Sequence, residues 1–218
     1  MTGAIVLAGG GSRRFGSDKL AVPLADGRSV LAHAVAAAGM VAGELLVVVA
    51  PSGSRPDDLP DRAVIVHDPE PDGGPLLGLA AGLEAARDES ILLVGGDMPE
   101  LDPAVLRLLV AAVRDDAGVD AARLEVGESD AGTTVRRGSP VPGSVAVLPC
   151  VLRREAALAA CRDSLAAGDR RLRGCLERLA TSVVPGEAWR AADPTGRTLL
   201  DIDRPDDLVG LERLPESG

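Results

Sequence analysis

Aromatic residues are almost absent from this 218-residue chain, which has one Phe, one Trp and no Tyr. Proteins that bind single-stranded nucleic acid stack bases on several aromatic side chains, so the sequence excludes that class. Positive charge is also scarce, because 23 Lys and Arg residues stand against 33 Asp and Glu, for a formal net charge of −10. Nucleic-acid binding requires a basic surface that neutralises phosphates. We therefore expect no nucleic-acid partner.

Cysteine is scarce as well, and its spacing carries no metal or disulfide signature. The three cysteines, Cys150, Cys161 and Cys175, form no CxxC pair. An odd number without such spacing is typical of reduced, buried thiols, which predicts a cytoplasmic protein. The N-terminus has no basic region ahead of its first apolar run, so we expect no signal peptide. Residues 30–50 are weakly polar but Ala-rich and interrupted by glycines, so they predict no membrane span.

The first half of the chain alternates short apolar runs with amphipathic stretches. Four runs bounded by Gly, Pro or Asp are typical of strands buried on both faces. These runs are residues 4–8, 45–50, 63–66 and 91–94. Three stretches predict helices, at residues 29–38, 75–87 and 102–114. The alternation predicts an α/β fold in which helices cover a mostly parallel sheet.

The alternation weakens after Asp115. Residues 128–143 are rich in Gly and Pro, and we expect a loop or a distorted hairpin there. Further along, the pattern predicts two helices, two strands and a last short helix, at residues 152–166, 170–180, 182–185, 198–202 and 205–214. No linker divides the chain. The sequence therefore predicts a single domain over residues 1–214 and a disordered tail at 215–218.

A glycine-rich loop with three cations follows the first predicted strand. Residues 9–11 are all Gly, and Arg13, Arg14 and Lys19 follow them. The dinucleotide pattern GxGxxG fails because Arg14 stands at its last glycine, and the P-loop pattern fails because Ser17 stands at its lysine. Glycines let backbone amides approach a phosphate closely. The loop therefore predicts a site for a polyanionic ligand.

The loop and three later blocks carry a family resemblance. The sequence LAGGGSRRFGSDK at residues 7–19 resembles the signature LAGGxSxRMGxDK of the molybdenum cofactor guanylyltransferase (MobA-like) family of nucleotidyltransferases, with Phe15 in place of Met. Three blocks similar to other family motifs follow in the family's order: HDP with GGPLLGL (67–69 and 73–79), GGDMP (95–99) and DIDRPDDL (201–208). The resemblance implies a three-layer α/β/α, Rossmann-like nucleotidyltransferase fold of the glycosyltransferase-A-like kind.

The resemblance also implies a reaction and its partners. The enzyme is expected to transfer a nucleoside monophosphate, GMP from GTP in the leading interpretation, to the terminal phosphate of molybdopterin. Pyrophosphate leaves, and Mg²⁺ is the cofactor. The attacking phosphate oxygen is already ionised at neutral pH, so the reaction needs positioning and charge neutralisation rather than a general base. The expected partners are GTP or another NTP, a molybdopterin-type phosphate acceptor and, transiently, proteins of molybdoenzyme maturation.

Charge and position in the sequence predict which residues contact the nucleotide. Lys19 is the strongest candidate for neutralising phosphate charge and is expected to be catalytic. One of Arg13 and Arg14 is expected to face the triphosphate or the acceptor, and we assign Arg13 as catalytic. The resemblance implies that Lys19 and Asp97 share the nucleotide site with residues of the first and second blocks: Leu7, Ala8, Gly9, Gly10 and Asp68.

The predicted metal site depends on two acidic segments. Asp97 follows a buried strand, at the edge where α/β sheets bind ligands, so its carboxylate is expected to hold Mg²⁺ and to be catalytic. Asp203 is the expected second ligand, and Asp201 is its rival. Alternation along the predicted strand 198–202 would place both carboxylates on one face.

Departures from the family pattern leave base and acceptor open. Ala50 stands near the position where guanine-using members carry Asn, and Asp201 and Asp203 replace residues that are often Asn. The alternatives are the same chemistry with CTP, a sugar or alcohol phosphate acceptor, or a non-catalytic cofactor-binding module. Two basic clusters could meet an acceptor phosphate or form a solvated face. They consist of Arg136 and Arg137, and of Arg170, Arg171 and Arg173.

Overall fold

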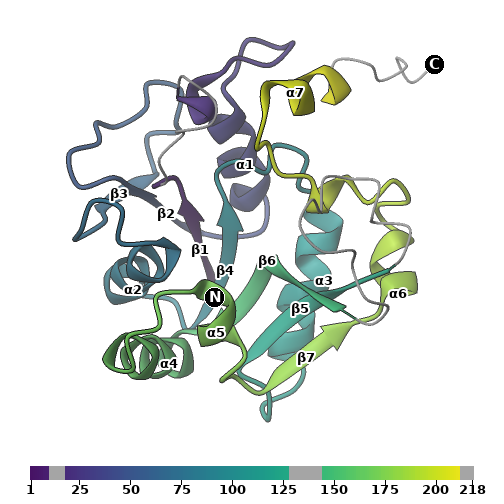
Figure 1. The fold of residues 1–218 in the computed structure, drawn as a ribbon. Coiled ribbons are helices and arrows are strands. Elements are labelled where there is room, and N and C mark those ends of the chain that lie inside the picture. Colours follow the sequence, from purple (N-terminus) through teal and green to yellow (C-terminus); the bar gives the residue numbers. More distant parts are fainter. Residues whose placement is uncertain (10–17, 128–143, 212–218) are drawn as a thin grey trace.

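One mixed sheet of seven strands forms the centre of the molecule, in the order β3-β2-β1-β4-β6-β5-β7 (Figure 1). The computed structural model describes residues 1–9, 18–127 and 144–211. The strands are β1 (Thr2–Leu7), β2 (Glu44–Val49), β3 (Val64–His67), β4 (Ser90–Gly95), β5 (Ala121–Val126), β6 (Ser144–Arg153) and β7 (Thr181–Val184). The helices are α1 (Val30–Gly39), α2 (Pro75–Ala85), α3 (Pro103–Arg114), α4 (Arg154–Ala166), α5 (Leu172–Leu176), α6 (Gly186–Arg190) and α7 (Pro205–Leu211), with 3-10 turns η1 (Lys19–Ala21) and η3 (Arg197–Leu199).

The strand order creates a topological switch point between β1 and β4. The chain moves outward from β1 to β2 and β3, then returns to place β4 on the other side of β1. These four strands are parallel, and Ile5 of β1 pairs with Leu46 of β2 and with Leu93 of β4. Strand β6 runs antiparallel to β4 and β5. In open α/β sheets, ligands bind outside the carboxyl ends of the strands at such a switch point.

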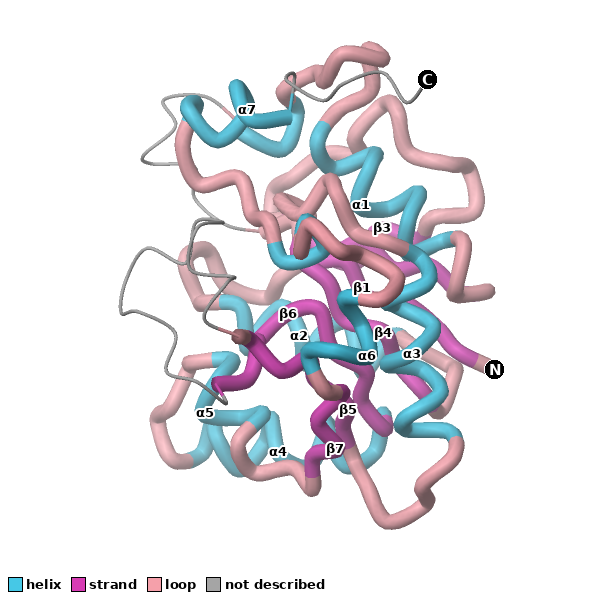
Figure 2. Tube along the Cα trace, turned by 90° about the vertical axis from the view of Figure 1, so that its right-hand side faces the viewer, coloured by secondary structure: helices cyan, strands magenta, loops and turns pink. Residues whose placement is uncertain are grey.

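Helices cover both faces of the sheet, as the alternation predicted. Helices α1 and α3 lie on one side and α4 and α5 on the other (Figure 2). Because side chains alternate along a strand, Ala4 and Val6 of β1 join the cluster under α1 and α3, whereas Ile5 joins the cluster under α2, α4 and α5. Strand β4 repeats this division, with Leu92 in the first cluster and Leu93 in the second. The three-layer α/β/α expectation is confirmed.

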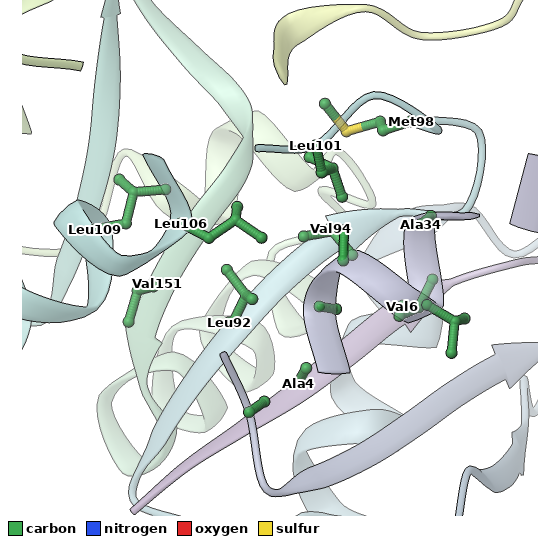
Figure 3. Packing of buried hydrophobic residues seen from close by; sticks show 14 of the residues in the cluster. Ala4, Val6, Ala34, Leu92, Val94, Met98, Leu101, Leu106, Leu109 and Val151 are labelled. Atoms are coloured by element: carbon green, nitrogen blue, oxygen red, sulfur yellow. The ribbon is translucent and has the colours of Figure 1, made fainter. Parts of the chain in front are cut away.

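The three helices of the first half begin where their capping residues predicted. The Ser29 side chain accepts a hydrogen bond from Ala32 N, and the Asp102 side chain accepts one from Ala104 N. Pro75 and Pro103 occupy first-turn positions, where a missing N–H has no cost. Figure 3 shows how α3 is then held, because its Leu106 packs near Leu92 of β4 in the buried cluster. Among the described residues, no helix has the length and apolar character needed to cross a bilayer.

The second half corrects several expectations. Strands β5 and β6 were not expected, and α4 begins at Arg154 rather than near residue 152. Strand β5 was not recognised because it contains a buried arginine, Arg123. The Arg123 guanidinium donates to Ala146 O at 2.7 Å and to Val145 O at 3.2 Å, beside a register shift between β5 and β6. The inward Arg removes the apolar alternation by which a strand is normally recognised.

The C-terminal part also differs from expectation in detail. Strand β7 confirms the strand predicted at 182–185, but α5 is shorter than the helix expected over 170–180, and α6 was not expected. Residues 198–202 do not form a strand: they contain the end of η3 and then an extended segment. The interpretation of 128–143 and the expected tail lie outside the described residues.

Candidate active site at the carboxyl edge of the sheet

The Lys19 ammonium lies between two carboxylates at the switch point. Its Nζ donates to Asp97 Oδ2 at 2.8 Å, to Ile202 O at 2.7 Å and to Asp203 Oδ1 at 3.3 Å. Burial lowers the pKa of Lys19, but attraction to Asp97 and Asp203 outweighs burial, so the pKa lies above its ordinary value. The side chain therefore stays positive over the neutral range and presents a fixed cation at this edge.

Asp97 is positioned by the turn that follows β4. Gly96 N donates to Leu7 O at 2.9 Å, which joins this turn to the end of β1. Met98 and Leu101 are buried and anchor the turn on the apolar cluster beyond Val94 (Figure 3). A Cβ at Gly95 would lie 2.5 Å from Asp97 Oδ1, so the fold-back of the carboxylate depends on this glycine.

The C-terminal segment completes the site from the far end of the chain. Ile202 is fully buried and its N–H donates to Asp97 O at 2.9 Å, which places Asp201 and Asp203 on either side of the contact. Burial, followed by repulsion from Asp203 and Asp97, raises the pKa of Asp201 to about 6. The Asp203 side chain is 57% exposed and faces Lys19. In Figure 1 the yellow segment leads from the C-terminal half of the molecule up to α7.

The predicted nucleotide-contact residues gather beside β1. Asp68 is buried, its N–H donates to Val49 O at 2.8 Å, and its Oδ1 accepts from Glu70 N at 3.1 Å. A Cβ at Gly9 would lie 3.6 Å from the carbonyl carbon of Val49 and 3.9 Å from Asp68 Oδ2. Gly9 and Asp68 are therefore neighbours, although 59 positions separate them. The end of β1 lies beside both groups, because Ala8 N donates to Val48 O at 2.8 Å and Leu7 O accepts from Gly96 N, next to Asp97. Arg13 and Gly10 lie outside the described residues.

A cavity of about 670 Å³ lies beside the ends of β1 and β2. Its wall includes Ala8, Asp18, Ser29 and the loop of residues 52–58. Asp58 fixes this loop to the start of α1, because its Oδ2 accepts a hydrogen bond from Ser29 N at 2.8 Å. The volume lies in the range of small-molecule sites. Sequence analysis missed this wall because the loop carries no motif and becomes adjacent to β1 only through the fold.

The carboxylates of Asp97 and Asp203 could hold a magnesium ion that is shared with substrate. Among the described residues, no group of three or more His, Cys, Asp or Glu side chains is arranged to hold a metal ion. Asp97 and Asp203 nevertheless face one cation already, the Lys19 ammonium. Mg²⁺ takes one or two carboxylates and completes its octahedron with waters and substrate phosphates. Asp97 and Asp203 would therefore supply the one or two carboxylates that Mg²⁺ usually takes from a protein.

Two arginines of the later basic clusters are paired with acidic side chains. Arg170 pairs with Glu70 at 2.7 Å, and Arg171 pairs with Asp169 at 2.9 Å, on exposed surface. Arg136 and Arg137 lie outside the described residues.

Comparison with known proteins places this geometry in a family. A family model described as a MobA-like NTP transferase domain matches residues 4–183. The chain belongs to the MobA-like NTP transferase family. It is therefore a nucleotidyltransferase, as the four sequence blocks predicted. The family model ends before the C-terminal segment, so Ile202 and Asp203 lie beyond the matched residues.

Relatives of this MobA-like transferase carry one shared name. It is 37% identical over 211 residues to a Chloroflexus aggregans protein named "Probable molybdenum cofactor guanylyltransferase", covering 95% of this chain and 92% of that protein. A Deinococcus radiodurans protein of the same name is 32% identical over 209 residues, covering 95% of this chain and 92% of its own length. Both alignments span nearly the whole of each protein.

Solved structures share the fold of this MobA-like transferase. Molybdopterin-guanine dinucleotide biosynthesis protein A from Archaeoglobus fulgidus has a TM-score of 0.69 at 23% identity, over 97% of each chain. The 2-C-methyl-D-erythritol 4-phosphate cytidylyltransferase from Thermus thermophilus has a TM-score of 0.65 at 21% identity, covering 98% of this chain and 100% of that one. At these identities the likeness shows the fold alone, and it confirms the Rossmann-like nucleotidyltransferase class.

Proposed function

We propose that this protein is a molybdenum cofactor guanylyltransferase. It transfers GMP from GTP to the terminal phosphate of molybdopterin and releases pyrophosphate. The observation that supports the chemistry best is the Lys19 ammonium, which two carboxylates fix at the switch point of the sheet. The shared name of full-length relatives supports the choice of base and acceptor.

The reaction joins one oxygen to phosphorus and releases another. An ionised oxygen of the acceptor phosphate attacks the α-phosphorus of GTP, and the bond from that phosphorus to the bridging oxygen of the β-phosphate breaks. The electron pair leaves with pyrophosphate, and no proton has to be removed from the nucleophile. Charge neutralisation is therefore the main task of the site.

Each predicted residue has a defined part in this proposal. Lys19 neutralises charge that develops on the phosphates, and Arg13 is assigned the same task from the glycine-rich loop. Asp97 and Asp203 would hold Mg²⁺, which when bound supplies further positive charge to the triphosphate. The nucleotide lies against the main chain of residues 7–10, with Asp68 beside Gly9.

The proposal includes a setting for the reaction. The enzyme acts in the cytoplasm, where its three buried, free thiols stay reduced. The product has to reach a molybdoenzyme, so we include a transient contact with proteins of molybdoenzyme maturation.

A nucleotide screen tests the function directly. The full chain is incubated with molybdopterin, Mg²⁺ and one of GTP, CTP, ATP or UTP, and pyrophosphate and product mass are measured. We expect turnover with GTP and a product heavier than molybdopterin by one GMP unit. Turnover with CTP instead would replace the base, and turnover only with a sugar or alcohol phosphate would replace the acceptor. Tight GTP binding without turnover on any acceptor would make the protein a binding module.

A further inference from the structure

The segment that carries Ile202 and Asp203 is bound to the turn that carries Asp97, in part by residues outside the four sequence blocks. Three contacts lie between the two segments. Arg197 Nε pairs with Glu100 Oε2 at 2.6 Å, the Thr198 hydroxyl accepts from Asp102 N at 3.1 Å, and Ile202 N donates to Asp97 O at 2.9 Å. The three contacts join residues 197–202 to residues 97–102.

The Arg197–Glu100 pair is the charged member of this set and is largely shielded from water. The side chains are 18% and 25% exposed, close to the 17% and 28% of the Lys19–Asp97 pair. Salt weakens a shielded ion pair little, and removing one partner leaves the other charge shielded from water without an opposite charge. This pair therefore fixes the start of η3 against the turn that carries Asp97.

The far side of the segment is held by Asp193. This buried carboxylate accepts from Thr198 N at 2.7 Å and from the Thr195 hydroxyl at 2.9 Å. Gly196, in the turn between them, has φ 71, a left-handed conformation that favours glycine. The first two residues of η3 are therefore held from both sides, and the next contact with the Asp97 turn is made by Ile202.

We infer that Glu100 and Arg197 are positioning residues for the proposed transfer: their ion pair sets the register in which Ile202 and Asp203 meet Lys19 and Asp97. The inference rests on the proposed function for its kinetic part only. Neither residue touches the Lys19 contacts directly. Both act through the peptide of Ile202, whose N–H is bonded to Asp97 and whose carbonyl is bonded to Lys19.

The test uses the full chain with Glu100→Gln and Arg197→Gln, and with the charge swap Glu100→Arg/Arg197→Glu. Arg114→Gln is the matched control, because Arg114 pairs with Asp115 at the opposite end of α3. We expect each single variant to lower kcat for GTP by about 10- to 100-fold, as small misplacements of reacting groups do, while KM for GTP changes less than about 3-fold. The swap should recover part of kcat, and the control should match the wild type.

A second measurement does not depend on turnover. Amide hydrogen exchange at Ile202 should become about 10-fold faster in both single variants, while amides of β1 and β4 exchange as in the wild type. Unchanged exchange at Ile202 together with unchanged kcat would overturn the inference, as would equal losses in the Arg114→Gln control. If the wild type transfers no nucleotide, the proposed function fails, yet exchange at Ile202 still decides the positioning role.

Discussion

Lys19 and Asp97 are 78 positions apart in the sequence, and their side chains meet at 2.8 Å at the carboxyl edge of the sheet. The lysine comes from the turn after the glycine-rich loop and the aspartate from the turn after β4. Ile202 and Asp203 complete the arrangement from the C-terminal segment. Four consequences of this contact and of its supports can be measured.

Replacing Lys19 tests the fixed cation. We expect Lys19→Gln to lower kcat for GMP transfer by about 10²- to 10³-fold, the usual loss when one preorganised charge-stabilising donor is removed. Circular dichroism should be unchanged, because the sheet does not depend on this side chain. Arg28→Gln is a suitable control, since Arg28 pairs with Asp26 on the surface. Equal activity of Lys19→Gln and the control would contradict the assignment.

Replacing Asp97 tests the proposed metal site. Asp97→Asn keeps the shape of the side chain but removes its charge, so we expect loss of Mg²⁺-dependent transfer with an intact fold. A titration of activity with Mg²⁺ should show no recovery up to concentrations that saturate the wild type. Asp102→Asn is the control, because Asp102 serves as the N-cap of α3 and not as a ligand. Full activity of Asp97→Asn would refute the metal role.

Ionisation of Asp201 is expected to lower the free energy of unfolding. Its pKa is about 6 in the folded protein, against an ordinary value of 3.8. Between these values the folded state keeps a proton that the unfolded chain has released, so the free energy of unfolding falls as pH rises through this window. Asp201→Asn should therefore raise the free energy of unfolding at pH 7.5 by up to about 3 kcal/mol.

Urea denaturation in EDTA at pH 4 and pH 7.5 measures this effect. The gain from Asp201→Asn should be large at pH 7.5 and small at pH 4. A loss of stability at pH 7.5 would show that the carboxylate is better satisfied than its burial indicates.

Asp193 should show the opposite pH dependence. Burial opposes its ionisation, but hydrogen bonds from Thr198, Thr195 and the Arg197 N–H outweigh burial and lower its pKa. Its contribution to stability is present above the unfolded pKa and is lost as pH falls through the lower, folded pKa. We expect Asp193→Asn to cost about 1–3 kcal/mol at pH 7, since it weakens buried, charge-assisted hydrogen bonds. The cost should shrink toward pH 3, and thermal melts across pH 3–7 would show whether it does.

Much of the fold was accessible from sequence because its signals are local. Ser29 and Asp102 mark helix starts through side-chain bonds to their own helices, and Pro75 and Pro103 mark them by occupying first-turn positions. The apolar runs of β1 and β4 are continuous because both faces of these strands are covered. Strand β5 was missed because Arg123 satisfies main-chain carbonyls of β6, a requirement that exists only once the two strands have paired.

The candidate site likewise has residues that the sequence predicted and supporting residues that it did not. Lys19 and Asp97 stand in recognisable motifs, and the structure brings them into contact. Their supports, such as the Arg197–Glu100 pair, join residues 97 positions apart and belong to no motif. The strand expected over residues 198–202 was wrong because this segment bonds to the Asp97 turn and to Lys19 instead of to a neighbouring strand.

The wide separation of Lys19 from Asp203 has a consequence for biosynthesis. The ribosome delivers Lys19 after β1 and before the other six strands, and it delivers Asp203 after all seven strands have been made. Because nascent chains fold progressively from the N-terminus, the sheet can assemble while the ammonium still lacks its last two oxygen partners. A chain terminated just after β7 would therefore contain every strand of the sheet but would lack the Lys19 contacts with Ile202 and Asp203.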